Sequence, residues 1–261
     1  MTELFDTHAH LNDDAFAHDR QQALERAGQA GVRGIVEIAD SPGDWAKAIA
    51  LSRAWPSVRC SLGLHPYYAD QYSPELVADL KKRADIPEVV AIGEIGLDYV
   101  KTDIPRAIQL EAFERLLQAC RDWDRPAVIH CRGAYQDLIG VLRRVFPRPN
   151  QTHRYHGVVH CFSGTPEEGR VCASLGFALG VDGPVTYPKN DELRRAFYEI
   201  GVDSLVLETD SPYLPPQSCR GKRNDPARLA EIAEKLSSVL GISAQELGKA
   251  TTRNARALYR L

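Results

Sequence analysis

The amino-acid sequence predicts a (β/α)8 barrel, in which eight parallel strands alternate with helices. Three observations lead to this prediction: eight short apolar segments recur along the 261 residues, helical patterns lie between them, and polar side chains follow most of the apolar segments. A doubly wound α/β fold would usually have fewer strands and a glycine-rich first turn, whereas the first turn here is rich in histidine. Because no domain-scale linker, internal repeat or low-complexity tract interrupts the chain, we expect residues 1–261 to form one domain.

Each predicted strand is a short apolar run with β-forming character. In chain order the strands are expected at residues 4–10, 34–39, 58–65, 89–97, 127–131, 158–162, 177–181 and 205–209. The clearest helical patterns are at residues 15–30, 105–123 and 133–146, and the second of these places Leu110, Phe113, Leu116 and Leu117 on one face. A helix at 226–240 follows the last strand, and 244–259 is a C-terminal helical extension. Non-helical insertions are expected at 147–156 and 212–226.

The composition is that of an ordinary globular protein, with 44% hydrophobic residues, 26% charged residues and a net charge of -3. This charge excludes an overall basic field but allows a local basic rim. No apolar run of about 18 residues and no signal-peptide pattern is present, so we expect no membrane association. The six cysteines form no CxxC motif, which favours reduced thiols and a cytoplasmic location. No obligate protein partner is indicated.

The first predicted strand ends in a His-x-His motif within FDTHAHLN, residues 5–12. Residues two apart on a strand project to the same face, so His8 and His10 both point into the barrel or both point out. Two buried imidazoles without partners are costly, whereas a divalent cation would bind both. Alone, the motif fits one core and one surface histidine equally well. Asp6, two residues before His8, points to the same face of the strand and is expected to support the ligands.

Two later strands end in the similar stretches AVIHCRG and GVVHCFSG. Alternation along each strand directs His130 and His160 toward the barrel mouth and the following Cys131 and Cys161 toward the helix layer. We therefore expect two imidazole ligands here. Hydrogen-bonded histidines without a metal, and cysteine ligation against the alternation, remain alternatives.

Two other strands supply carboxylates. Glu94 lies between two glycines in VVAIGEIGLDY, where it needs metal cations or an ion pair with a barrel lysine or arginine, and the glycines would leave room for a metal or substrate. Asp210 ends the last strand, where it suits a ligand or general base, with Glu208 supporting the site from below. Asp98 is expected on the loop beyond its strand. Four histidines and two carboxylates match a carboxylate-bridged two-metal site that accepts zinc, manganese or magnesium.

The set of motifs resembles the TatD-type metal-dependent hydrolases and deoxyribonucleases, an amidohydrolase-like branch of TIM barrels. The resemblance rests on FDTHAHL, SLGLHPYYA, AIGEIGLDY, AVIHCRGA, VVHCFSG and LETDSPYLPP…GKRNDP, in order across nearly the whole chain. It implies two divalent cations bridged by Glu94. The implied ligands are His8, His10, Glu94 and Asp210 for one cation, and Glu94, His130 and His160 for the other. His65 matches a family position near the metals, as a phosphate-binding group, a proton donor or a structural histidine.

The resemblance implies hydrolysis of a phosphodiester by a metal-activated water, with Asp210 and His65 as catalytic groups. DNA is the expected substrate, and the net charge favours short or single-stranded ends over long duplex. The residues expected to contact it are Arg132, Tyr99, Arg220, Lys222 and Arg223. Tyr67, Tyr68 and Tyr213 are further candidates for stacking on bases.

Several alternatives stay open. The same metal site suits hydrolysis of an amide, ester or aminoacyl bond. A trinuclear phosphoesterase of the polymerase-and-histidinol-phosphatase type also begins with His-x-His, but it needs more ligands than these strand ends supply. A degenerate barrel that only binds a partner is disfavoured because all six ligand positions are intact. His153 and His156, in the 147–156 insertion, are either an extra ligand source or part of a solvated loop.

Overall fold

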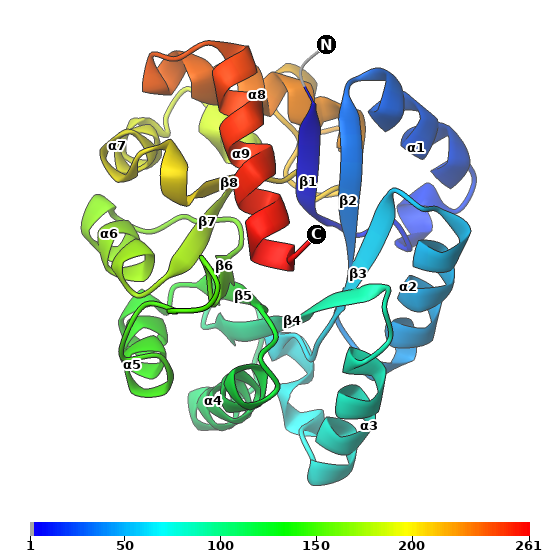
Figure 1. Ribbon diagram of the computed structural model, residues 1–261, viewed down its shortest axis with the longest axis vertical. Coiled ribbons are helices and arrows are strands. Elements are labelled where there is room, and N and C mark those ends of the chain that lie inside the picture. Colours follow the sequence, from blue (N-terminus) through cyan, green and yellow to red (C-terminus); the bar gives the residue numbers. More distant parts are fainter. Residues whose placement is uncertain (1–2) are drawn as a thin grey trace.

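The computed structural model describes residues 3–261 as a barrel of eight parallel strands that pair in sequence order (Figure 1). The strands are β1 (Leu4–Ala9), β2 (Val32–Ala39), β3 (Val58–Leu62), β4 (Val89–Asp98), β5 (Ala127–Arg132), β6 (Gly157–Val159), β7 (Phe177–Val181) and β8 (Leu205–Leu207). The barrel closes between β1 and the segment after β8, where the Asp210 amide donates to the His8 carbonyl at 2.9 Å. The predicted (β/α)8 class is confirmed, although β3, β6 and β8 end two or three residues earlier than expected.

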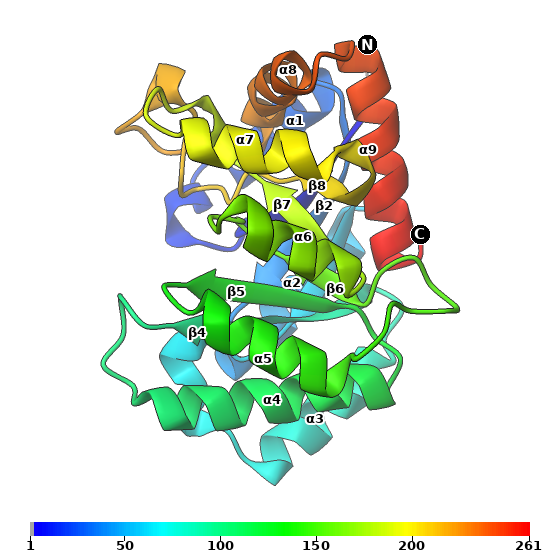
Figure 2. The ribbon, with the colours of Figure 1, turned by 90° about the vertical axis from the view of Figure 1, so that its left-hand side faces the viewer.

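The helices are α1 (Arg20–Gln29), α2 (Pro42–Ala54), α3 (Pro74–Ala84), α4 (Arg106–Asp122), α5 (Tyr135–Val145), α6 (Pro166–Ser174), α7 (Asp191–Ile200), α8 (Leu229–Leu240) and α9 (Ala244–Tyr259). Helices α1 to α8 surround the strands (Figure 1), and the side view shows α4 to α7 following one another along one side of the barrel (Figure 2). Two predicted helices begin late, because short 3-10 turns at Asp14–Phe16 and Pro226–Arg228 precede α1 and α8. Asp13 and Asp225 accept hydrogen bonds from the first turn of these segments, so the chain turns there before the α-helix starts.

Helix α9 covers the N-terminal end of the barrel, where it runs across the ring of strands in Figure 1. Its Leu258 and Tyr259 join the apolar interior formed by residues such as Phe5 and Val128. The Tyr259 hydroxyl donates to the Thr7 carbonyl at 2.8 Å, and Asn254 donates to the Leu205 carbonyl at 2.8 Å. The C-terminal extension therefore fills one end of the barrel, and the polar strand ends meet at the other.

The 147–156 insertion lies at the covered end, away from the polar strand ends. Its last residue, His156, donates its backbone N–H to Gly176 before β7 and accepts from Ala127 at the start of β5. The ring of His156 contacts the Arg148 carbonyl at 2.9 Å, and His153 contacts Asp124 at 3.2 Å. The insertion therefore cannot supply an extra ligand to a metal at the C-terminal ends of the strands.

The glycines beside Glu94 serve strand packing and not ligand access, which corrects the sequence interpretation. Gly93 has a φ of +153° and Gly96 a φ of +149°. A Cβ atom at Gly96 would overlap the carbonyl of His130, and one at Gly93 would overlap that of Val128. Both glycines thus allow β4 to approach β5 closely enough for Glu94 and His130 to meet.

Substitution of Gly96 with alanine is expected to lower the free energy of unfolding by more than about 3 kcal/mol, because it combines an unfavourable φ with a backbone overlap. Urea unfolding monitored by tryptophan fluorescence measures the loss. Gly28→Ala in α1 is the matched control: its Cβ would meet nothing within 4 Å, so a gain of about 0.5–1 kcal/mol is expected. Equal stability of the two variants would contradict the packing argument.

Within the described residues, no helix combines the length and apolar character needed to cross a membrane. All six cysteines are free thiols, as expected from their spacing.

Candidate metal centre

The side chains of β1 and of the segment after β8 form one group of ligand atoms at the C-terminal end of the barrel. His8 Nε2 lies 3.2 Å from His10 Nε2 and 3.3 Å from Glu94 Oε2. Asp210 Oδ1 lies 3.6 Å from His8 Nε2 and 3.4 Å from His10 Nε2. The two rings of the His-x-His motif therefore converge, as their alternation along the strand predicts, on the carboxylates of Glu94 in β4 and Asp210 in the segment after β8.

A second group surrounds the other oxygen of Glu94. Glu94 Oε1 lies 2.8 Å from His130 Nδ1 and 3.5 Å from His160 Nε2. His65 Nε2 is 3.7 Å from the same oxygen. One carboxylate thus presents Oε2 to the first group and Oε1 to the second, which is the arrangement that a bridging ligand requires.

The donor set fits divalent cations. Glu94 is 2% exposed, and its ion-pair partners in the part of the chain that the structure describes are all histidines. The alternative of a barrel lysine or arginine beside Glu94 is therefore wrong. Four groups of three His or carboxylate residues have ligand atoms within 4.8 Å of one another, and none of these groups includes a cysteine. Imidazole nitrogens mixed with carboxylate oxygens suit zinc and manganese, and the carboxylates also suit magnesium.

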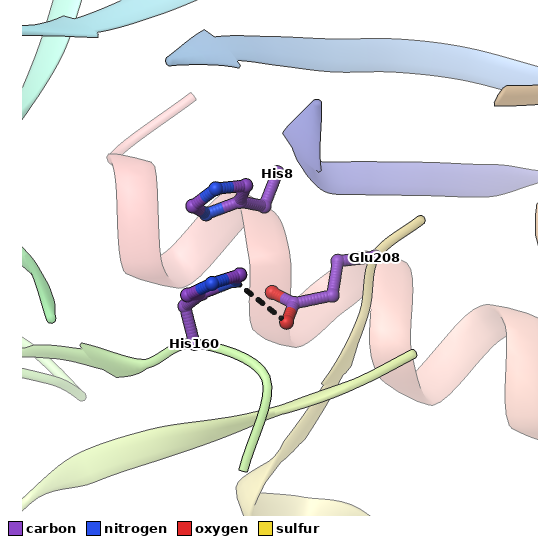
Figure 3. Close-up of side chains that lie close together, drawn as sticks. All are labelled: His8, His160 and Glu208. Atoms are coloured by element: carbon purple, nitrogen blue, oxygen red, sulfur yellow. Dashed lines mark hydrogen bonds and ion pairs between the residues drawn. The ribbon is translucent and has the colours of Figure 1, made fainter. Parts of the chain in front are cut away.

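Glu208 orients His160 from below. Its Oε1 lies 3.1 Å from His160 Nδ1 (Figure 3). The carboxylate also accepts a hydrogen bond from the Cys161 amide. The His160 and His8 rings stack with centroids 3.6 Å apart. Because a carboxylate accepts, the proton of His160 is held on Nδ1, and Nε2 is left facing Glu94.

Asp98 supports His130 in the same way, which the sequence did not reveal. It is the last residue of β4 and is fully buried, whereas it was expected on the loop beyond the strand. Its Oδ2 lies 3.2 Å from His130 Nε2, and its Oδ1 accepts the amides of Val100 and Lys101 at 2.9 and 2.8 Å. Burial opposes the charge, but these hydrogen bonds keep the pKa of Asp98 well below its usual range.

Asp40, directly after β2, is a second residue that sequence reasoning missed. Its Oδ2 lies 3.8 Å from His10 Nδ1, and it forms a possible ligand group with His10 and Glu94. Its Oδ1 is buried and has no hydrogen-bond partner among the described residues. The sequence did contain a signal for this residue, because Asp40 directly follows the second predicted strand. Like His130, it is a polar residue at the C-terminal end of an apolar run.

Asp6 and Cys161 do not face the ligand groups. Asp6 accepts hydrogen bonds from the Thr209 amide at 2.9 Å and hydroxyl at 2.6 Å, so it joins β1 to the segment after β8. Cys131 packs in the helix layer as expected, but Cys161 does not. A φ of +46° at Cys161 turns its Sγ to within 2.9 Å of Asp182 Oδ2, because β6 has already ended at Val159.

The buried charges of the site are balanced by protons on histidines. Burial disfavours the charged form of His160, but the carboxylates of Glu94 and Glu208 raise the pKa of His160 to about 10. Burial likewise opposes the charge of Glu94, yet the nearby His160 and His8 hold the pKa of Glu94 well below its usual range. Bound cations would take the place of these protons. Burial instead lowers the pKa of His8 and that of His65, which falls to about 3, so the His65 ring is neutral.

Two of the expected substrate contacts, Arg132 and Tyr99, lie at the C-terminal ends of β4 and β5. Arg132 is exposed as the last residue of β5. The Tyr99 hydroxyl donates to Asp137 at 2.7 Å, and the Arg106 guanidinium lies 4.0 Å from the centre of the Tyr99 ring. Arg132 is thus open to a ligand, whereas Tyr99 is engaged in contacts with α4 and α5.

The other three expected contacts lie on the loop after β8. The Arg220 guanidinium lies 4.3 Å from the centre of the Tyr187 ring, and Lys222 is exposed. Arg223 donates to Asp19 at 2.6 and 2.7 Å and to the carbonyl of Ala15 at 2.6 Å. Arg223 therefore anchors this loop to the start of α1.

Comparisons with known proteins agree with this architecture. A family model described as TatD related DNase matches residues 5–260. The chain is 33% identical over 258 residues to a Bacillus subtilis protein named uncharacterized metal-dependent hydrolase YabD, with 99% of each chain covered. It is 35% identical over 264 residues to the 3′-5′ ssDNA/RNA exonuclease TatD of Pantoea vagans, covering 99% of this chain and 100% of the relative. The crystal structure of YjjV, a TatD homologue from Escherichia coli, superposes with a TM-score of 0.91 at 31% identity and covers 99% and 98% of the two chains. The chain therefore belongs to the TatD-related DNase family of metal-dependent hydrolases.

Proposed function

We propose that this chain removes nucleotides from the 3′ ends of single-stranded DNA or RNA by hydrolysing phosphodiester bonds with two bound divalent cations. The observation that carries the proposal is the placement of the two Glu94 oxygens, each beside a separate group of histidine ligands. The relatives named as single-strand exonucleases support the substrate and the direction of cleavage.

In this proposal, His8, His10, Glu94 and Asp210 would hold one cation. Glu94, His130 and His160 would hold the second. Zinc, manganese and magnesium all suit these ligands. Bound cations supply Lewis-acid stabilisation of the phosphoryl oxygens and lower the pKa of a water molecule toward neutrality.

Asp210 is the proposed proton acceptor. Burial opposes its charge, but the hydrogen bond from His10 and the nearby His160 lower the pKa of Asp210, so its carboxylate is ionised at neutral pH. Its Oδ1 lies 3.4 Å from His10 Nε2 and 3.6 Å from His8 Nε2, within the first group of ligand atoms. An ionised carboxylate at that place can take the proton of the attacking water.

His65 is the proposed hydrogen-bond donor to the substrate. The backbone N–H of Tyr67 donates to His65 Nδ1 at 3.2 Å, so Nδ1 is an acceptor. A neutral ring with an accepting Nδ1 carries its proton on Nε2, and this atom faces Glu94 Oε1 at 3.7 Å. His65 thus carries an N–H at the edge of the second group of ligand atoms, and we propose that it donates to a phosphoryl or leaving-group oxygen of a bound substrate.

Exposed cations at the rim would bind the flanking phosphates. Arg132, Arg220 and Lys222 are the proposed contacts, with Arg223 holding the loop that carries two of them. The net charge of -3 favours short or single-stranded ends, because few phosphates are neutralised at once.

Digestion of a 5′-labelled single-stranded oligonucleotide in manganese, magnesium or zinc tests the function. A ladder of products shortened from the 3′ end is expected, with a much slower reaction on blunt duplex. The parallel substrate is a p-nitrophenyl ester, which measures the alternative of carboxyl-centre hydrolysis. Cleavage of the ester without cleavage of the oligonucleotide in any of the three metals would overturn the proposal.

A further inference from the structure

Two tyrosines at the mouth of the barrel share an unusual set of contacts. Tyr67 follows β3 and Tyr213 follows β8, and their side chains are 41% and 51% exposed. The Tyr67 ring makes a T-shaped contact with His65 at 4.3 Å, and the Tyr213 ring makes one with His10 at 5.6 Å. Each ring therefore lies against a histidine of the metal centre while much of its surface stays open to solvent.

The hydroxyl groups of both tyrosines are held by carboxylates. Tyr67 donates to Asp98 Oδ2 at 3.3 Å, and Tyr213 donates to Asp13 Oδ2 at 2.7 Å. A ring fixed by a hydrogen bond at one end and by a neighbouring ring beside it loses little further freedom on binding a ligand. The exposed aromatic surface is thus prepared for contact with a flat apolar group.

The surroundings of Tyr67 identify the chemistry of that group. Asp98, which accepts the hydrogen bond of the Tyr67 hydroxyl, is paired in register with the exposed Arg132 on the neighbouring strand β5. An aromatic surface next to an exposed guanidinium matches a base attached to a phosphodiester. Tyr213 contacts the opposite part of the ligand cluster, through His10, so the two rings flank the metal centre.

We propose that Tyr67 and Tyr213 each stack on an unpaired nucleobase, on either side of the scissile phosphate. This inference rests on the proposed nuclease function and adds the residues that recognise the strand. In a duplex the bases are stacked on one another and paired, so their faces are not available to these rings. Stacking at two fixed positions therefore selects single-stranded substrate without reading its sequence.

The test combines enzyme variants with substrates that lack one base. Wild type, Tyr67→Ala and Tyr213→Ala are compared on an intact 12-nucleotide strand and on strands with a single abasic residue at each of the three 3′-terminal positions. On the intact strand each variant is expected to lose about tenfold in kcat/KM. Tyr67→Phe keeps the ring and is expected to stay within about threefold of wild type. Tyr198→Ala is the matched control, because Tyr198 is 65% exposed on α7 in the outer helix ring.

The decisive result is how the two changes combine. If Tyr67 stacks on a base, an abasic residue at one position lowers the kcat/KM of wild type about tenfold but does not lower that of Tyr67→Ala any further. For Tyr213→Ala, the same result is expected with the abasic residue at a different position. If every abasic residue lowers the rate of the variants as much as that of wild type, the rings do not contact bases and the proposal is overturned. Failure of wild type to cut the intact strand would contradict the nuclease function itself.

Discussion

Replacing Glu94 with glutamine is expected to abolish hydrolysis, with a loss of at least about 10³-fold in kcat. The amide keeps the size of the side chain but replaces one ligand oxygen with an NH₂ group, which cannot bind a cation. Because Oε1 and Oε2 face different groups of histidines, the substitution disrupts one group directly and removes the shared charge from both.

Metal content after dialysis, measured by elemental mass spectrometry, is the second readout for Glu94→Gln. The metal content is expected to fall, while the far-ultraviolet circular dichroism spectrum of the variant stays like that of wild type, because glutamine keeps the size of the Glu94 side chain. Glu167→Gln is the control, because Glu167 is an exposed residue of α6 that pairs only with Arg170 in the described chain. Unchanged metal-dependent turnover of Glu94→Gln would show that Glu94 is not a ligand.

Metal affinity is expected to rise with pH between pH 6.5 and 8.5. For every proton that the metal displaces, the affinity should increase by about tenfold per pH unit. The reason is the pKa of His160, which burial lowers but Glu94 and Glu208 raise to a net value of about 10. Below pH 10 the free ring is protonated, so a cation must displace that proton to bind. Treatment with a chelator is accordingly expected to remove activity more readily at pH 6.5 than at pH 8.5.

The same pKa sets the stability of the metal-free protein. Since the folded-state pKa of His160 lies above the ordinary value of 6.5, its contribution is complete below pH 6.5 and is lost as the pH rises toward 10. The unfolding midpoint of the metal-free protein should therefore fall over this window, and added metal should restore it most at high pH.

Titration of free Mn²⁺ by electron paramagnetic resonance at several pH values measures the affinity. Glu208→Gln removes one of the carboxylates that raise the pKa of His160, so the metal affinity of this variant should change less steeply with pH. An affinity that stays constant from pH 6.5 to 8.5 would show that metal binding displaces no proton.

The fold class and the gathering of site residues were predictable because parallel strands place their C-terminal ends at one edge. Any polar residue that ends an apolar run, such as His10 or His130, must then lie near the others. His8 and His10 also point to the same side of the chain, as predicted, because the alternation of side chains along a strand is a local property. The same rule applied to β2 would have found Asp40.

Contacts between distant segments were not predictable in this way. Asp98 can contact His130 only because β4 extends as far as Asp98 and stays paired with β5 up to that residue. Cys161 faces Asp182 because β6 ends two residues before it, so alternation no longer governs its direction. Arg223 resembles a phosphate-binding residue in the sequence, yet it pairs with Asp19, which lies 204 residues away.

The sequence by itself determined which residue types stand at the ends of the strands, and with them the eight-stranded barrel and a histidine and carboxylate centre. These follow from short-range alternation and from the burial of apolar runs. Only the tertiary structure decided that the two oxygens of Glu94 face separate groups, that Asp98 orients His130, and that carboxylates hold the hydroxyl groups of Tyr67 and Tyr213 at the mouth. Those outcomes depend on the register between strands and on the close approach of β4 to β5, which side-chain periodicity does not encode.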